Sequence, residues 1–121
     1  MTAIGLDLIE VERVERALER RPRLAERLFT PAERAYADAR ARPAMHLAGR
    51  FCAKEAVAKS LGLRRWSPQQ IEVVPKEGAP QLALHGEVAA RARELGAEVR
   101  ISITHTRETA AAVAVLSRPE S

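Results

Sequence analysis

Residues 44–61, AMHLAGRFCAKEAVAKSL, decide the fold. The stretch contains no proline, and alanine and other good helix formers dominate it. Gly62 follows directly, and glycine is common just after the end of a helix. These features predict one long helix, around which the shorter elements must be arranged.

Four charged side chains lie among the small apolar residues of this helix: Arg50, Lys54, Glu55 and Lys59. Arg50 and Lys54 are four positions apart, and so are Glu55 and Lys59. Residues at that spacing project from the same side of a helix. The helix therefore carries two charged pairs as well as a large apolar surface.

The residues before the long helix predict a strand followed by short helices. Residues 3–9, AIGLDLI, alternate in a way typical of a strand with one largely apolar face, made by Ile4, Leu6 and Leu8. Residues 10–27 have a helical pattern that is interrupted near proline 22, so two short helices fit. A further helix begins at Thr30, with proline at position 31 and glutamate at 33, and ends before proline 43.

The residues after the long helix predict two hairpins separated by a helix. Residues 71–75 and 81–85 are short strands around the turn sequence KEGAP. Residues 86–95 form an alanine-rich helix that ends at Gly96. Residues 98–104 and 109–116 are β-rich runs around THTRE. This order of elements predicts an α+β fold, with the long central helix packed on an antiparallel sheet in a single domain over residues 1–121.

Composition limits the partners and the compartment. The 121 residues include only four aromatic side chains, so the core is modest and burial between subunits would help it. The net charge of +4 favours anionic partners: nucleic acid, a phosphorylated cofactor or an acidic protein. A single cysteine, no signal-peptide pattern and no membrane-length apolar run predict a cytoplasmic protein that does not contact membranes.

Asp7 is unusual because aspartate is depleted in strands. In the simplest interpretation, Asp7 caps a turn or meets an arginine, and Glu55 and Lys59 form a surface ion pair worth about 0.3–0.5 kcal/mol. In a second interpretation, Asp7 and Glu55 hold Mg²⁺, since this ion is commonly bound by one or two carboxylates together with phosphate oxygens and water. Arg50, Lys54 and Lys59 would then contact the phosphates. The residues alone leave both interpretations open.

Three blocks of the chain, in this order and spacing, are similar to a known family. They are GLDLIEVERV at 5–14, GRFCAKEAVAKSLG at 49–62 and ISITHTRETAAAVAVL at 101–116. Together they resemble the 4′-phosphopantetheinyl transferase superfamily, in its short bacterial form. The resemblance implies an enzyme that transfers 4′-phosphopantetheine from coenzyme A to a serine of apo acyl carrier protein and releases 3′,5′-ADP, in fatty acid biosynthesis.

The resemblance also implies a homotrimer with Mg²⁺ and coenzyme A in clefts between subunits. It assigns Asp7 and Glu55 to the metal and Lys59 to phosphate. Arg50 and His105 match positions near the nucleotide end of coenzyme A. We expect Glu55 to act as the general base, directly or through a metal-bound water.

The arginine-dense segment of residues 13–27 allows two interpretations. Mixed charge of this kind is usually a solvated helix face with internal ion pairs. The resemblance implies that the segment docks an acidic carrier protein, with Arg13 most prominent and Arg20 and Arg27 beside it.

Two other functions are compatible with parts of the sequence. A small basic nucleic-acid-binding module would explain the charge, but it leaves Asp7 and the Lys54, Glu55 and Lys59 group without a role and lacks aromatic residues for stacking on bases. A broad-range transferase of the same superfamily is typically about twice as long. Of the other residues, His46 is expected to be structural or exposed, and Cys52 to be a core residue.

Overall fold

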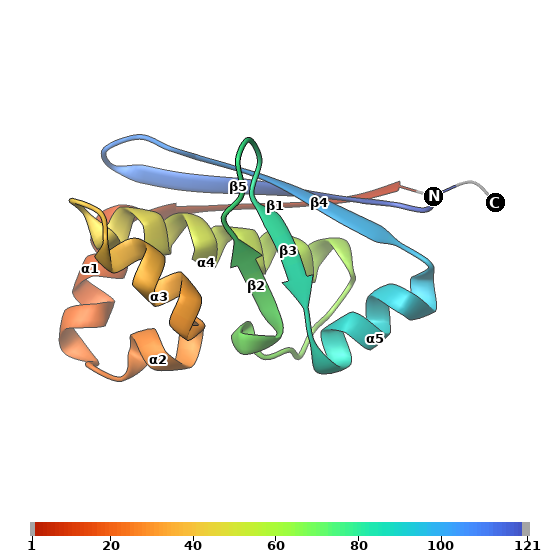
Figure 1. The fold of residues 1–121 in the computed structure, drawn as a ribbon, viewed down its shortest axis with the longest axis horizontal. Coiled ribbons are helices and arrows are strands. Elements are labelled where there is room, and N and C mark those ends of the chain that lie inside the picture. Colours follow the sequence, from red (N-terminus) through yellow and green to blue (C-terminus); the bar gives the residue numbers. More distant parts are fainter. Residues whose placement is uncertain (1, 120–121) are drawn as a thin grey trace.

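The computed structural model describes residues 2–119. A three-stranded antiparallel sheet has the order β1-β5-β4, formed by Thr2–Glu10, Thr109–Ser117 and Glu98–His105. The long helix α4, Pro43–Ser60, lies along one face of this sheet (Figure 1). The predicted α+β class and the packing of the long helix on an antiparallel sheet are confirmed.

The shorter elements surround α4 (Figure 1). Helices α1, α2 and α3 gather near its N-terminal end, and the β2–β3 hairpin and α5 lie further along. The bounds are α1 Val11–Arg20, α2 Leu24–Leu28, α3 Pro31–Asp38, β2 Ile71–Val74, β3 Gln81–Leu84 and α5 Gly86–Leu95. Each predicted helix and strand is present, most of them within two residues of the expected bounds; the helix after Thr30, expected to end before proline 43, ends at Asp38. A short 3-10 turn, η1 at Pro68–Gln70, was not predicted.

The predicted helix ends have the expected local chemistry. Thr30 forms a capping box with Glu33: the Glu33 amide donates to Thr30 Oγ1 at 3.2 Å, and the Thr30 amide donates to Glu33 Oε1 at 2.8 Å. Gly96 ends α5 in the left-handed conformation, with φ of 59°. These contacts satisfy backbone groups that a helix end leaves without intrahelical partners.

Small side chains fill the interface between α4 and the sheet. Ala53 and Ala56 of α4 and Ala110, Ala112 and Ala114 of β5 are buried in one core cluster. Because these side chains are short, the backbones of the helix and the strand approach closely. Among residues 2–119, no helix is long and apolar enough to cross a membrane.

The strand β1 places its large apolar side chains away from this core. Ile4, Leu6 and Leu8 are 67%, 63% and 67% exposed, whereas Gly5 is buried. The reason is geometric, because alternate residues of a strand face opposite sides and the Gly5 side lies against α4. The apolar face that the sequence predicted is therefore on the outside of the single chain.

Gly5 is required for the contact between β1 and α4. A Cβ atom at this position would lie 1.8 Å from the Ala56 carbonyl oxygen and 2.8 Å from its carbon. The obstacle is backbone, so no side-chain rotation relieves it. Only glycine allows the strand to pass this close to the helix.

Gly5→Ala should lower the free energy of unfolding by at least about 2 kcal/mol, because the strand must move away from α4. Urea denaturation measures this loss. Gly96→Ala is the control: open space surrounds it, and only its left-handed backbone is strained, at about 1 kcal/mol. An equal or smaller loss for Gly5→Ala would contradict the close approach.

Candidate functional site

Asp7, Glu55 and Lys59 form a charged cluster where β1 crosses α4. Lys59 Nζ donates to the Leu6 carbonyl at 2.8 Å and to Asp7 Oδ1 at 3.4 Å. The pKa of Glu55 is raised by burial and by the nearby Asp7 carboxylate, and Lys59 opposes this rise. The structure thus brings together the two carboxylates and the lysine that the sequence singled out. Lys59 pairs with Asp7, not with Glu55 as the simplest interpretation had it.

The donor set of this cluster fits a hard divalent cation. The Asp7 carboxylate raises the pKa of Glu55, and a cation beside both groups would offset this repulsion. Within residues 2–119, no group of three or more histidine, cysteine, aspartate or glutamate side chains forms a complete metal cage. A cation at Asp7 and Glu55 would therefore need further oxygen ligands from water or substrate, which is typical of Mg²⁺.

Cys52 lies in the core next to this cluster. Burial raises the pKa of its thiol to about 12, with Asp7 as the next cause. The thiol donates to the Ala110 carbonyl at 3.5 Å. The group stays protonated and serves as a core residue, as the sequence predicted.

A second cluster lines a pocket of about 220 Å³ on another side of α4. Arg50 is only 6% exposed, its guanidinium carbon lies 3.9 Å from the centre of the Tyr36 ring, and its Nε has no hydrogen-bond partner within residues 2–119. The rings of His46 and His105 are 5.7 Å apart in an edge-on arrangement. Burial lowers the pKa of His46, and His105 and Arg50 lower it further. The buried guanidinium and its Nε, unsatisfied among the described residues, give this pocket a donor that would suit an anion.

Sequence reasoning missed several residues of this pocket. It placed Arg50 and His105 together but left His46 as structural or exposed and KEGAP as a turn. The pocket is lined in full by Tyr36, Met45, His46, Gly49, Arg50, Pro75, Lys76, Gly78, Pro80, Ile103 and His105. The spacing of His46 and Arg50, one helical turn apart, was the available signal.

The two clusters lie on opposite sides of α4 and at opposite edges of the sheet. Glu55 follows Arg50 by five positions and Lys59 follows it by nine, which turns them about 140° and 180° around the helix. Asp7 belongs to β1, and His105 belongs to β4, with β5 between these two strands. One chain therefore carries two separate clusters, one on each side of α4.

Lys54 belongs to neither cluster, which corrects its assignment to the phosphates. Its side chain is fully buried, and Nζ donates to Glu33 Oε1 and to the Pro68 carbonyl, each at 2.7 Å. Glu33 also accepts from the Val73 amide at 2.8 Å. Burial lowers the pKa of Lys54, and Glu33 opposes this. The Lys54 ammonium joins α4 to α3 and to the 3-10 turn, and Glu33 extends this link to β2; its full burial keeps phosphate away.

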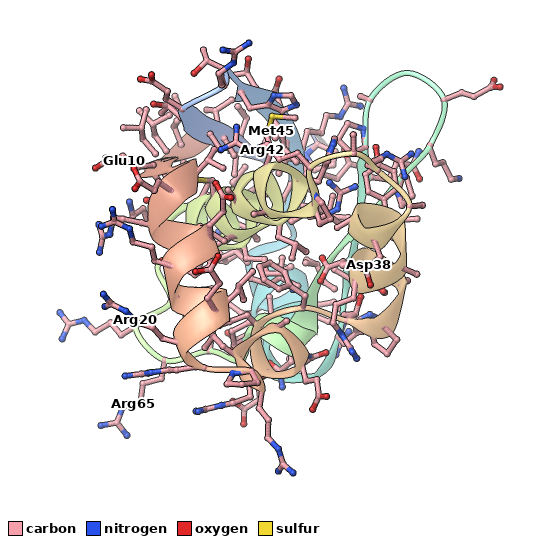
Figure 2. The ribbon with its side chains drawn as sticks, turned by 90° about the vertical axis from the view of Figure 1, so that its left-hand side faces the viewer. Glu10, Arg20, Asp38, Arg42, Met45 and Arg65 are labelled. Carbon is pink, nitrogen blue, oxygen red and sulfur yellow. The ribbon has the colours of Figure 1, made fainter. Side chains whose placement is uncertain are left out.

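The arginine-rich helices present a third surface. Arg13, Arg20 and Arg27 are exposed. Figure 2 shows Arg20 at the end of α1, with its side chain directed away from the body of the molecule. Arg13 also lines an apolar pocket of about 200 Å³, together with Ile9, Val14, Ala17, Leu18, Leu24, Leu28, Phe29 and Phe51. Positive charge thus borders an apolar hollow.

Known proteins are similar to this chain in sequence and in fold. Residues 3–114 match the family described as the 4′-phosphopantetheinyl transferase superfamily. The chain belongs to this superfamily. A relative from Moorella thermoacetica named holo-[acyl-carrier-protein] synthase is 49% identical over 120 residues, which cover 96% of this chain and 94% of the relative. A relative of the same name from Caldanaerobacter subterraneus subsp. tengcongensis is 44% identical over 93% of this chain and 91% of its own length.

Solved structures of the superfamily have the same fold. A Chronobacterium ammoniagenes ACPS–CoA complex has a TM-score of 0.86 at 31% identity, covering 99% of each chain. A Bacillus anthracis holo-(acyl-carrier-protein) synthase in complex with CoA (3′,5′-ADP) has a TM-score of 0.78 at 33% identity, covering 97% of this chain and 96% of that one. The resemblance drawn from the three sequence blocks is confirmed.

Lys54→Met should lower the free energy of unfolding by about 3–5 kcal/mol, because Glu33 is left as a buried charge without its partner. Urea denaturation measures this, with Lys76→Met as the control at an exposed lysine. The double variant Lys54→Met/Glu33→Gln should recover part of the loss. Unchanged stability in Lys54→Met would contradict the structural role of this superfamily motif residue.

Glu55→Gln should raise the melting temperature at neutral pH in the presence of a chelator. The folded-state pKa of Glu55 lies above its ordinary value, so stability falls as pH rises between those two values. The advantage of the variant should therefore be absent below the ordinary glutamate pKa and complete above the raised one. Glu98→Gln, on the exposed start of β4, is the control. An equal or lower melting temperature for Glu55→Gln at neutral pH would contradict the crowded carboxylates.

Proposed function

We propose that this chain transfers 4′-phosphopantetheine from coenzyme A to a serine hydroxyl of apo acyl carrier protein and releases 3′,5′-ADP. The observation that carries the proposal is the cluster of two carboxylates and one ammonium made by Asp7, Glu55 and Lys59. This cluster suits a pyrophosphate and its metal ion. The names of the relatives and the solved complexes with coenzyme A support the same activity.

The reaction is a displacement at the phosphorus that bears the pantetheine arm. The serine oxygen forms a new bond to that phosphorus, and the bond to the oxygen of 3′,5′-ADP breaks. Glu55, which lies on the long helix beside Asp7, would accept the serine proton, directly or through a water bound to the metal ion. Lys59 binds the phosphate oxygens and stabilises the charge that develops on the leaving group.

Asp7 and Glu55 would hold Mg²⁺, which supplies charge neutralisation at the pyrophosphate when bound. Arg50 and the neighbouring Lys76 provide positive charge, and His105 provides a ring nitrogen, that would hold the phosphate at the nucleotide end. Arg50 brings a buried donor, Nε, that no other described group satisfies. The two clusters would thus serve as half-sites for the two ends of coenzyme A.

A homotrimer would join these half-sites. The two clusters lie on opposite sides of α4, so a neighbouring copy of the chain could bring its own second cluster to the first. A second copy that supplies the other half completes the site. The outer face of the sheet supports such assembly, since Ile4, Leu6, Leu8 and Val115 leave large apolar side chains exposed. Closed cyclic symmetry would give three equal sites.

The acidic carrier protein would dock on α1 and α2, where Arg13, Arg20 and Arg27 are exposed beside the apolar pocket. Charge there steers the encounter, and the pocket gives apolar contact. A carrier protein of fatty acid biosynthesis in the cytoplasm would fit this docking surface. A cytoplasmic location also agrees with the single cysteine, Cys52, which is buried and makes no disulfide.

The direct test incubates the protein with coenzyme A, apo carrier protein and Mg²⁺, with and without a chelator, and measures the intact mass of the carrier. The proposal predicts a gain of one phosphopantetheine that disappears with the chelator. No gain with several carriers, from a folded protein, would overturn it.

Arg13→Ala should raise the Michaelis constant for the carrier by roughly five- to tenfold, because a rim charge near an acidic partner is lost. The Michaelis constant for coenzyme A should stay nearly the same. Arg93→Ala on α5, away from the docking helices, is the matched control. An unchanged carrier constant in Arg13→Ala would count against this docking surface.

A further inference from the structure

The ammonium of Lys59 has a defined place beside the two carboxylates. Its shorter hydrogen bond, at 2.8 Å, is to the Leu6 carbonyl, and the bond to Asp7 Oδ1 is 3.4 Å. The Leu6 carbonyl belongs to β1, next to the residue at which the strand contacts α4. The Lys59 ammonium is therefore held by a backbone carbonyl whose position the fold fixes, although the Lys59 side chain is 53% exposed.

The Lys59 ammonium is itself a cation, so it opposes the binding of a divalent cation in this cluster. Asp7 and Glu55 attract a divalent ion, but any ion that they bind comes close to the ammonium that already contacts Asp7. Like charges at such short range repel appreciably even in a high dielectric. A phosphate group reverses the balance, because it attracts both the metal ion and the ammonium.

We propose that Lys59 makes divalent-cation binding at Asp7 and Glu55 conditional on a phosphate of coenzyme A. This inference rests on the proposed function and deepens it. With the ammonium held at the Leu6 carbonyl, the carboxylates bind a cation weakly. When the phosphate is present, Lys59 and the cation share one anion, so each ligand strengthens the binding of the other.

The test measures the binding of Mn²⁺ by the loss of the electron paramagnetic resonance signal of the free ion. In the absence of coenzyme A, Lys59→Met should bind Mn²⁺ about three- to tenfold more tightly than the parent protein, since the repelling charge is gone. Lys59→Arg keeps the charge and should stay close to the parent. Arg93→Met removes a distant cation and should leave the affinity unchanged.

The coupling gives a second readout. The factor by which coenzyme A tightens Mn²⁺ binding should be smaller in Lys59→Met than in the parent. Equal Mn²⁺ affinities in the parent and Lys59→Met, including no measurable binding by either, would overturn the inference. So would a Lys59→Arg variant that behaves like Lys59→Met.

The conditional binding of the cation and the proposed transfer activity can fail separately. If the carrier gains phosphopantetheine in a chelator-sensitive way while the two Mn²⁺ affinities agree, the conditional binding is wrong and the transfer activity stands. If the carrier gains no mass, the proposed function fails as well.

Discussion

The contact between Gly5 and the backbone of Ala56 positions the cluster of Asp7, Glu55 and Lys59. It brings β1 so close to α4 that no Cβ fits between them. Asp7 lies two residues along the strand, on the same face as Gly5, so it is carried to the side of Glu55 and Lys59. The small residues of α4 and β5 extend this close packing across the rest of the sheet.

The four charges of α4 have three different environments, although they lie within ten residues. Lys54 is in the interior and pairs with Glu33. Arg50 lies over Tyr36 at the wall of a pocket, and Glu55 and Lys59 face β1. The helix therefore combines a buried ion pair with two charged clusters that point away from each other. That separation is the physical argument for a site shared between copies of the chain.

Local sequence signals predicted the elements well, because proline, glycine and capping residues act within a few positions. The capping box at Thr30 and the end of α5 at Gly96 are examples. Contacts between residues that are distant in the sequence were harder to predict. Nothing near Lys54 indicated that Glu33, in a different helix, would neutralise it. The outward direction of Ile4, Leu6 and Leu8 depends on which face α4 covers. The family resemblance, and not the spacing along the chain, predicted that Asp7 and Glu55 would lie together.

We propose that the two half-sites of one catalytic site come from two copies of the chain. Asp7→Asn removes one half and Arg50→Met removes the other, so each variant alone should be inactive in carrier modification. After the two are unfolded and refolded together at equal amounts, random mixing should restore about one quarter of the sites. Activity near that level would support the shared site. No recovery, in mixed oligomers verified by mass spectrometry, would contradict it.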